Sequence, residues 1–274
     1  MYIDSHQHFW KISRGDYSWM TPNYKQLYKD FKASDLQPII EKINISHTII
    51  VQAADTIAET EFILNIADNN SFVSGVVGWV DFNKSDVTND IDKLIQNKHL
   101  KGFRPMIHDI ADKNWMLNSN LEKSFKYLIK KNLTFDALVR PNHLKNLYIF
   151  ATKYSDLPIV IDHIAKPKIV DQEIDEWKND MKKLSELENI YCKYSGILTE
   201  IGKDYKIDQI KPYINFIFET FNTNKVMWGS DWPVLTMVEQ YQNWFDIANN
   251  LISHFSKNEK MNIFHNTAKK FYRL

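Results

Sequence analysis

The sequence predicts an α/β fold in which eight parallel strands and their helices form a single, distorted (β/α)8 barrel of the TIM type. Short runs rich in β-branched and aromatic residues alternate along the chain with longer stretches of helical period. Eight such runs can be counted. An open, doubly wound sheet is the alternative, but the glycine-rich turn that usually follows its first strand is missing after Phe9. We therefore expect one barrel domain over residues 1–274.

The strands are predicted where β-branched and aromatic residues gather between polar segments. In chain order these runs are 3–9, 47–53, 73–80, 100–104, 133–138, 158–163, 190–195 and 226–230. The helices are predicted where apolar residues recur with helical spacing. They are 56–69, 86–97, 117–131, 142–154, 174–187, 209–221, 237–255 and 260–272, the last of which closes the fold.

One segment departs from this regular alternation. Residues 11–34 form a long loop between the first strand and its helix, and the loop carries Tyr17, Trp19, Tyr24 and Tyr28. Long aromatic loops over the mouth of a barrel often act as lids. We expect this one to cover the functional site.

The composition limits what the protein binds. The 34 lysines and arginines balance 34 aspartates and glutamates, so no bulk charge points to nucleic acid or to a membrane, and a small-molecule partner is expected. The single cysteine, Cys192, excludes an internal disulfide and favours a reducing cytoplasm. Neither a signal peptide nor a bilayer-spanning window is expected. The sequence carries no signal for an oligomeric state.

The first predicted strand contains His6-Gln7-His8, the segment most suggestive of chemistry. In an extended strand, side chains two residues apart point to the same face, so the two imidazoles project together. Zinc and similar divalent ions accept histidine nitrogens. A structural role for both histidines is the alternative, and partners elsewhere in the chain must decide between the two.

Barrel enzymes place their chemistry at the carboxyl ends of the strands, and here those ends are polar. The predicted rim consists of His6, His8, Gln52, Trp79, Asp81, Arg104, Asp136, His163, Lys193 or Ser195, and Asp231. Three imidazoles and one carboxylate of this rim make a mononuclear site for one divalent ion, with zinc favoured and one position open. These four residues are His6, His8, His163 and Asp231.

Three rim residues are the predicted catalytic groups. Asp231, in the sharp turn VMWGSDWP, would take a proton from water and return it to a leaving oxygen, and a cap on the next helix is its structural alternative. Arg104 would hold substrate oxygens through its fork of donors, unless it only pairs with Asp136 or Asp81. His163 would act beside them, and a buried structural histidine is its alternative.

The remaining predicted contacts are to substrate. Tryptophans at a barrel mouth can stack on an apolar sugar face, although they are at least as often part of the core. Lys166 reaches the pocket or lies on the surface. Asp162 precedes His163 in the same predicted strand, so we expect it to face the opposite way. The predicted substrate-binding residues are Gln7, Trp10, Trp19, Gln52, Trp79, Arg104, Asp136, Lys166 and Trp232.

Several segments together resemble the amidohydrolase superfamily, and more narrowly its amidohydrolase-related sugar lactonases, typified by L-fucono-1,5-lactonase and L-rhamnonolactonase. The specific segments are the opening IDSHQHFW and the later VMWGSDWPV. Weaker ones are DYSWM, VQAADTIAETEFIL, GFRPMIHD, PIVIDHIAKP, KYSGILTE and FHNTAKKFYRL. The resemblance covers the chain from end to end.

This resemblance implies a distorted barrel that opens an L-fuconolactone-like sugar lactone to its hydroxy acid. It implies that Asp231 activates water and that Arg104 contacts the substrate. The histidines would be ligands of one divalent ion or, in members without metal, direct donors to the lactone carbonyl. A binuclear centre is not expected, because the fourth and fifth strand ends, FRP and FDAL, lack the lysine that binuclear members carboxylate.

Two other functions stay open at this point. Zinc-dependent decarboxylases of the same superfamily carry a similar set of histidines and an aspartate. A barrel that binds a sugar acid without turnover would use the same residues. Hydrolysis of a carboxylic ester, the lactone, is the predicted reaction, because the neutral composition and the HQHFW segment favour the lactonases over the decarboxylases. A lactone is favoured over an amide because an ester needs less help to its leaving group at a site with one acid/base group.

Overall fold

The computed structural model describes residues 1–274 and confirms the predicted barrel, with eight parallel strands that pair in sequence order. They are β1 (Tyr2–Gln7), β2 (Ile45–Val51), β3 (Val73–Gly78), β4 (Leu100–Phe103), β5 (Thr134–Ala137), β6 (Ile159–Ile161), β7 (Ile190–Tyr194) and β8 (Val226–Trp228). Two hydrogen bonds join the ends of β1 and β8: the N–H of His8 donates to the carbonyl of Trp232 at 2.7 Å, and the N–H of Asp231 to that of His6 at 2.8 Å. These bonds bring the first and last strands together.

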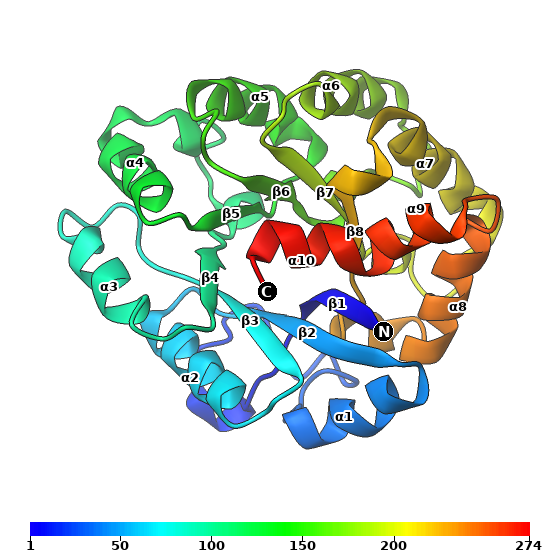
Figure 1. Ribbon diagram of the computed structural model, residues 1–274, viewed down its shortest axis with the longest axis horizontal. Helices are drawn as coiled ribbons and strands as arrows, with labels where there is room; N and C mark the ends of the chain where they lie inside the picture. The colour runs from blue at the N-terminus through cyan, green and yellow to red at the C-terminus, as the bar shows by residue number, and fades with distance from the viewer.

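The chain has ten α-helices, and all but the last two form a ring around the strands (Figure 1). They are α1 (Ala33–Lys42), α2 (Ile57–Asp68), α3 (Val87–Leu94), α4 (Glu122–Lys130), α5 (Leu144–Lys153), α6 (Asp175–Ser185), α7 (Ile207–Thr220), α8 (Tyr241–Leu251), α9 (Lys257–Met261) and α10 (Thr267–Tyr272). Helix α3 is an example of their amphipathic pattern, because it buries Val87, Ile91 and Leu94 at helical spacing. None of the helices has both the length and the apolar composition that crossing a membrane requires.

The observed strands end one or two residues before their predicted ends. Residues such as His8, Arg104 and His163 leave the hydrogen-bonded ladder and turn into the mouth of the barrel. The single helix predicted over 260–272 is also interrupted, because Asn262–Asn266 form a π-helical turn between α9 and α10. The early ends of the strands matter for function, because polar side chains at the carboxyl ends no longer follow the alternation of a strand.

The amino-terminal end of the barrel is closed by the end of the chain. Side chains from the strand interior, among them Ile3, Val77 and Met227, form a small apolar cluster with Phe271 and Tyr272 of α10. In Figure 1, α10 lies across the centre of the ring of strands. A ligand therefore has to enter from the opposite, carboxyl-terminal end.

The loop over residues 11–34 packs on the carboxyl end of the barrel through aromatic rings. Trp10 and Phe31 form an isolated backbone bridge that draws the two ends of the loop together. The ring of Trp10 stands edge-on to Trp19 at 5.7 Å between centroids, and Phe31 stands edge-on to Trp232 at 5.3 Å. The loop is thus held against the segment that follows β8.

Candidate active site

The ends of β1 and β8 place a histidine pair against Asp231. The rings of His6 and His8 lie 4.9 Å apart, one edge-on to the other. Asp231 has a φ of +59°, in the left-handed region that an aspartate adopts only where its surroundings enforce it. Its N–H bond to the carbonyl of His6 provides that restraint, so the turn holds the carboxylate over the histidines.

Three imidazoles converge on one oxygen of this carboxylate. Oδ1 of Asp231 lies 3.3 Å from Nε2 of His8 and 3.7 Å from Nε2 of His6. Nε2 of His163 lies 3.8 Å from the same oxygen. All four side chains are at most 5% exposed, so the cluster is nearly removed from bulk water.

Two glycines allow the histidines to sit this close to the backbone. A Cβ on Gly196 would lie 2.3 Å from Nδ1 of His163, and Gly196 also has a φ of +61°. A Cβ on Gly229 would lie 2.7 Å from Cβ of His6. Any larger residue at either position would displace a site histidine.

The turn after β6 corrects the prediction for Asp162. The strand ends at Ile161, and His163 and the three residues after it have φ between 47° and 64°. The alternation of a strand does not apply to such a left-handed turn. Asp162 therefore does not face away from the site, since its carboxylate lies 3.5 Å from Nδ1 of His6 and 3.3 Å from Nη1 of Arg104.

Hydrogen bonds to its guanidinium and to its backbone carbonyl hold Arg104 at the mouth. Its Nη2 donates to the carbonyl of Gln52 at 2.5 Å, and the side-chain amide of Gln52 donates back to the carbonyl of Arg104 at 2.7 Å. Nη1 lies 3.4 Å from Nε2 of His6. The acid that pairs with it is Asp162, not Asp136 or Asp81. A guanidinium held in this way is preorganised to meet a substrate oxygen.

The second ring nitrogens of two histidines have defined partners. Nδ1 of His8 lies 2.7 Å from the carbonyl of Val51, so it must carry a proton and leave a lone pair on Nε2 in the neutral ring. Nδ1 of His163 lies 2.9 Å from the hydroxyl of Ser195, which can either donate or accept. These contacts of Nδ1 therefore fix the orientation of both rings.

His6 stands between two opposite charges. Its Nδ1 is 3.1 Å from Nζ of Lys193 and 3.5 Å from the carboxylate of Asp162. If Nδ1 accepts from Lys193, then Nε2 carries the proton and can donate. If Nδ1 donates to Asp162, then Nε2 presents a lone pair to the site. The same ring can thus serve as a hydrogen-bond donor or as a metal ligand.

The protonation states follow from burial and from the neighbours. Burial acts to raise the pKa of Asp231, but the neighbouring His163 and His8 outweigh it, and the pKa lies below its usual 3.8. Burial lowers the pKa of His163 well below 6.5, and burial together with Lys193 does the same for His6. At neutral pH the site combines an ionised Asp231 with neutral rings at His6 and His163.

Asp4 is a buried carboxylate that the sequence analysis did not select. Its Oδ1 accepts from the N–H groups of Ser230 and His6, at 2.8 and 3.1 Å. Its Oδ2 accepts from the hydroxyls of Ser230 and Tyr241, at 2.5 and 2.7 Å. Asp4 thereby ties β1 to the turn that carries Asp231. The available signal was an aspartate within a buried strand, which has to have partners.

Asp136 lies inside β5 and belongs to the floor of the barrel instead of its rim. Its Oδ2 accepts from Nζ of Lys193 at 2.5 Å and from the hydroxyl of Tyr272 in α10 at 2.7 Å. Lys193 is also 3.0 Å from Asp162. We call Asp136, Lys193 and Tyr272 the floor network. It supports the site from below through Asp162 and His6.

The predicted tryptophans divide into two pairs. Trp10 and Trp232 are buried in the aromatic packing of the loop, and the indole N–H of Trp10 donates to the carbonyl of Lys29 at 2.8 Å. Trp19 and Trp79 are half-buried and line a cavity of about 270 Å³ over the ends of β2, β3 and β4. Only the second pair is placed to touch a ligand.

Two other predicted contacts have partners within the protein. Gln7 donates through its side-chain amide to the hydroxyl of Thr48 at 3.1 Å, although its own amide oxygen is buried without a partner. Lys166 is half-buried and pairs with Glu200 at 2.5 Å. Neither side chain forms a hydrogen bond or an ion pair with the histidine cluster.

The donor set at the mouth fits a divalent ion. His6, His163 and Asp231 each offer a ligand atom, and these atoms lie within 4.8 Å of one another. His8 adds Nε2, whose lone pair is left free by the bond of Nδ1 to the carbonyl of Val51. Imidazole nitrogens and a carboxylate oxygen are ligands that zinc accepts, and the partners of Nδ1 hold the rings of His8 and His163 in place.

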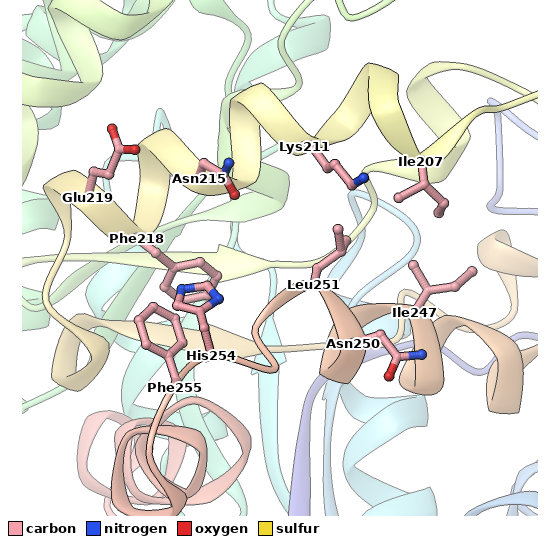
Figure 2. A pocket seen from close by; sticks show the side chains of 10 residues that line it. All are labelled: Ile207, Lys211, Asn215, Phe218, Glu219, Ile247, Asn250, Leu251, His254 and Phe255. Carbon is pink, nitrogen blue, oxygen red and sulfur yellow. The ribbon is translucent and has the colours of Figure 1, made fainter.

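A larger cavity, of about 630 Å³, lies elsewhere, on the outside of the barrel between α7 and α8 (Figure 2). It has an apolar floor that includes Phe218, Leu251 and Phe255, and Lys211 is among its polar lining residues. None of the residues at the carboxyl ends of the strands lines it. Its size alone does not make it the site of chemistry.

Comparison with known proteins agrees with this fold. The sequence model of the amidohydrolase family matches residues 3–274. The chain belongs to this family. A curated amidohydrolase relative named L-fucono-1,5-lactonase, from Burkholderia ambifaria, is 35% identical over 99% of this chain and 95% of its own length.

Solved amidohydrolase structures extend the comparison. The crystal structure of an amidohydrolase from Burkholderia multivorans with bound zinc has a TM-score of 0.94 at 26% identity, and covers 100% of this chain and 99% of its own. A dihydroxybenzoic acid decarboxylase from a Polaromonas species, with bound manganese, has a TM-score of 0.71 at 10% identity, with 100% and 97% covered. At that identity the decarboxylase shows a shared fold alone.

Proposed function

We propose that this amidohydrolase hydrolyses a sugar lactone of the L-fuconolactone type to the open hydroxy acid. The full-length similarity to a protein named L-fucono-1,5-lactonase supports the substrate class. The observation that carries the reaction is the arrangement at the mouth, where one ionised carboxylate faces three imidazoles and a fixed guanidinium. This combination provides a base together with donors for a developing oxyanion.

In the first step Asp231 acts as the general base. Its pKa is held low by His163 and His8, so it is ionised at neutral pH and can accept a proton. It takes one proton from water while the water oxygen attacks the lactone carbonyl carbon. The attack converts the carbonyl into a tetrahedral centre with a negative oxygen.

The negative oxygen is stabilised by fixed donors. Arg104 presents its guanidinium to the mouth from a backbone held by Gln52. A neutral His6 or His163 that carries its proton on Nε2 provides a second donor beside it. Donors that need no reorganisation when charge develops contribute several kcal/mol to such a step, on the order of 3 for one donor.

The second step returns the proton. The tetrahedral centre collapses, the bond between the carbonyl carbon and the ring oxygen breaks, and protonated Asp231 delivers its proton to that oxygen. One water is consumed and one hydroxy acid is formed. One acid/base group is enough for this reaction because an alkoxide leaves more readily than an amide nitrogen.

We also propose that the site holds one divalent ion, zinc in the first place. The residues that would hold it are His6, His8, His163 and Asp231. When bound, such an ion polarises a carbonyl oxygen or lowers the pKa of water. With the ion bound, the histidines would be ligands and no longer donors, while Asp231 would still move the proton and Arg104 would still orient the substrate oxygen.

The other predicted contacts take supporting roles in this proposal. Trp19 and Trp79 face the substrate from the cavity beside the mouth. Gln52 positions Arg104 through a hydrogen bond. Lys166 is a further substrate contact in this proposal and is held by its ion pair with Glu200. Asp136 acts through the floor network and does not touch the substrate.

The experiment is a paired assay on the purified chain. Acid release from L-fucono-1,5-lactone and related sugar lactones is followed with a pH indicator, and carbon dioxide release from dihydroxybenzoic acids is followed in parallel, each with and without added zinc. We expect acid release above the spontaneous rate and no carbon dioxide. Carbon dioxide release without lactone opening would replace the proposal by a decarboxylase, and binding without either product would make the barrel a carrier.

A further inference from the structure

Beside the histidine cluster lies a second, chemically distinct hollow over the ends of β2, β3 and β4. It has a volume of about 270 Å³ and is lined by indole rings and carboxylates. We call it the indole pocket and define it by Trp19, Trp79, Trp115, Asp55, Asp81 and Asp109. We propose that the indole pocket binds the hydroxyl-bearing carbons of an uncharged sugar lactone and selects against lactones that carry a carboxylate. This inference rests on the proposed function and adds a substrate class to it.

The pocket adjoins the proposed reaction centre through Arg104. Pro105 lines the pocket, and the residue before it sends its guanidinium to within 3.4 Å of Nε2 of His6. The reaction centre and the pocket are therefore lined by consecutive residues, Arg104 and Pro105. A lactone whose carbonyl lies at Arg104 and His6 can place its remaining ring carbons toward the pocket.

The indole rings are held in place by the protein. The N–H of Trp19 donates to the carbonyl of Ala53 at 2.7 Å. The backbone of Trp79 exchanges hydrogen bonds with the hydroxyl of Thr60, at 2.7 and 2.9 Å. Trp115 is nearly buried and stands edge-on to Phe82. Rigid indole faces offer flat apolar surface at little entropic cost, and the C–H face of a sugar ring matches it.

The carboxylates supply acceptors for hydroxyl groups and a negative potential. Asp55 and Asp109 are exposed at the rim, and Asp81 is half-buried. Asp109 pairs with His108 at 3.3 Å, while Asp81 accepts from the backbone and side chain of Asn83. No lysine or arginine lines the pocket. Sugar hydroxyls can donate to these oxygens, whereas a carboxylate on the substrate would be repelled.

The positive groups nearest to the pocket are paired with other carboxylates. Lys166 is paired with Glu200 at 2.5 Å. Arg104 is paired with Asp162 and directed at the reaction centre. The pocket itself thus keeps its negative character next to a centre that handles a neutral ester.

The first test separates the hydroxyl-bearing carbons from the lactone ring. Two substrates are compared, L-fucono-1,5-lactone and δ-valerolactone, which has the same six-membered ring without hydroxyls. We expect Trp79→Ala to raise KM for the sugar lactone about tenfold and to change kcat/KM for δ-valerolactone less than twofold. Trp79→Phe keeps an aromatic face, so its KM for the sugar lactone should lie close to that of the wild type. This variant is the control for a folding defect.

Two outcomes of this test contradict the inference in different ways. If the wild type opens lactones but Trp79→Ala lowers kcat/KM equally for both substrates, or for neither, the indole pocket is not the sugar site. If the wild type opens no lactone at all, the proposed function fails and this inference falls with it.

The second test addresses charge. The wild type should open a neutral aldonolactone at least tenfold faster than the matching lactone with a terminal carboxylate. The double variant Asp55→Asn/Asp81→Asn should narrow that ratio several-fold, because it removes the repulsion. Asp156→Asn, an exposed carboxylate between α5 and β6, is the matched control and should leave the ratio unchanged. A ratio that the double variant does not move would overturn the selection by charge.

Discussion

The mouth and the floor of the barrel both contain buried charges, but they use them differently. At the mouth, Asp231, Arg104 and His163 lie beyond the ends of their strands and keep a few per cent of their surface accessible. At the floor, Asp136 and Lys193 lie within β5 and β7 and are fully buried. The mouth therefore presents polar groups that a substrate can reach, whereas the polar groups of the floor are closed off from any substrate.

This difference arises from the backbone. Within a strand the ladder and the alternation of side chains fix each group against a neighbour. After the ladder ends, left-handed residues such as His163 and Asp231 turn their side chains inward without that constraint. Substitutions at the floor should therefore cost stability, while substitutions at the mouth should cost activity.

The largest effect is expected for Lys193→Met at the floor. The change leaves Asp136 and Asp162 buried without their shared ammonium group, and such an unpaired charge costs about 3 to 5 kcal/mol of unfolding free energy. Urea denaturation followed by tryptophan fluorescence measures the loss. Lys211→Met, which removes an exposed pair with Asp208, is the control and should cost less than about 0.5 kcal/mol. Equal losses for both variants would remove the distinction between floor and surface.

At the mouth, Arg104→Lys should lower kcat/KM for a sugar lactone about 10²-fold, because lysine keeps the charge but not the fork of donors. The free energy of unfolding should change by less than that of Lys193→Met. Steady-state acid release gives the first quantity and urea denaturation the second. The exposed Arg140 provides the control, since Arg140→Lys should change neither.

Between the two regions, Ser230→Ala tests how the turn of Asp231 is held. The hydroxyl of Ser230 donates to Asp4, and its own oxygen accepts from the N–H of Trp232 at 3.0 Å. Its loss should lower kcat about tenfold with little change in KM, because a slightly misplaced base slows the chemical step. Ser230→Thr should recover part of the rate. A variant that loses only stability would assign Ser230 to the scaffold.

The smallest effect on activity is expected for Tyr272→Phe at the floor. The change removes one hydrogen bond to Asp136, which is worth about 1 to 2 kcal/mol for a charged acceptor. The melting temperature should fall by a few degrees, while kcat/KM should stay within twofold of the wild type. A loss of activity without a loss of stability would show that the floor network acts on the chemistry directly.

The sequence predicts the fold and much of the site because both depend on periodicity. The rhythm of strands and helices gives the barrel, and the ends of its strands give His6, His8, Arg104 and Asp231. The same reasoning placed Asp136 at the rim, although it lies one residue before the end of β5 and points to the floor. A shift of one or two residues along a strand is enough to move a side chain from the mouth to the interior.

Other features depend on geometry that periodicity does not contain. The left-handed turn after β6 reverses the expected direction of Asp162, and no glycine marks that turn in the sequence. Asp4 finds its partners 226 residues away at Ser230. The bond between Lys193 and Asp136 likewise joins two strands that are not adjacent in the sheet. These contacts exist only because the sheet closes into a barrel.

The most direct measurement is the rate of acid release from L-fucono-1,5-lactone by Asp231→Asn, corrected for spontaneous opening and compared with the wild type. Asparagine tolerates the left-handed backbone and keeps the size of the side chain, but it cannot accept the proton from water. We predict a loss of kcat of about 10³-fold or more in a protein that unfolds within about 1 kcal/mol of the wild type. A folded Asp231→Asn variant that opens the lactone at the wild-type rate would contradict the assignment of Asp231 as the general base.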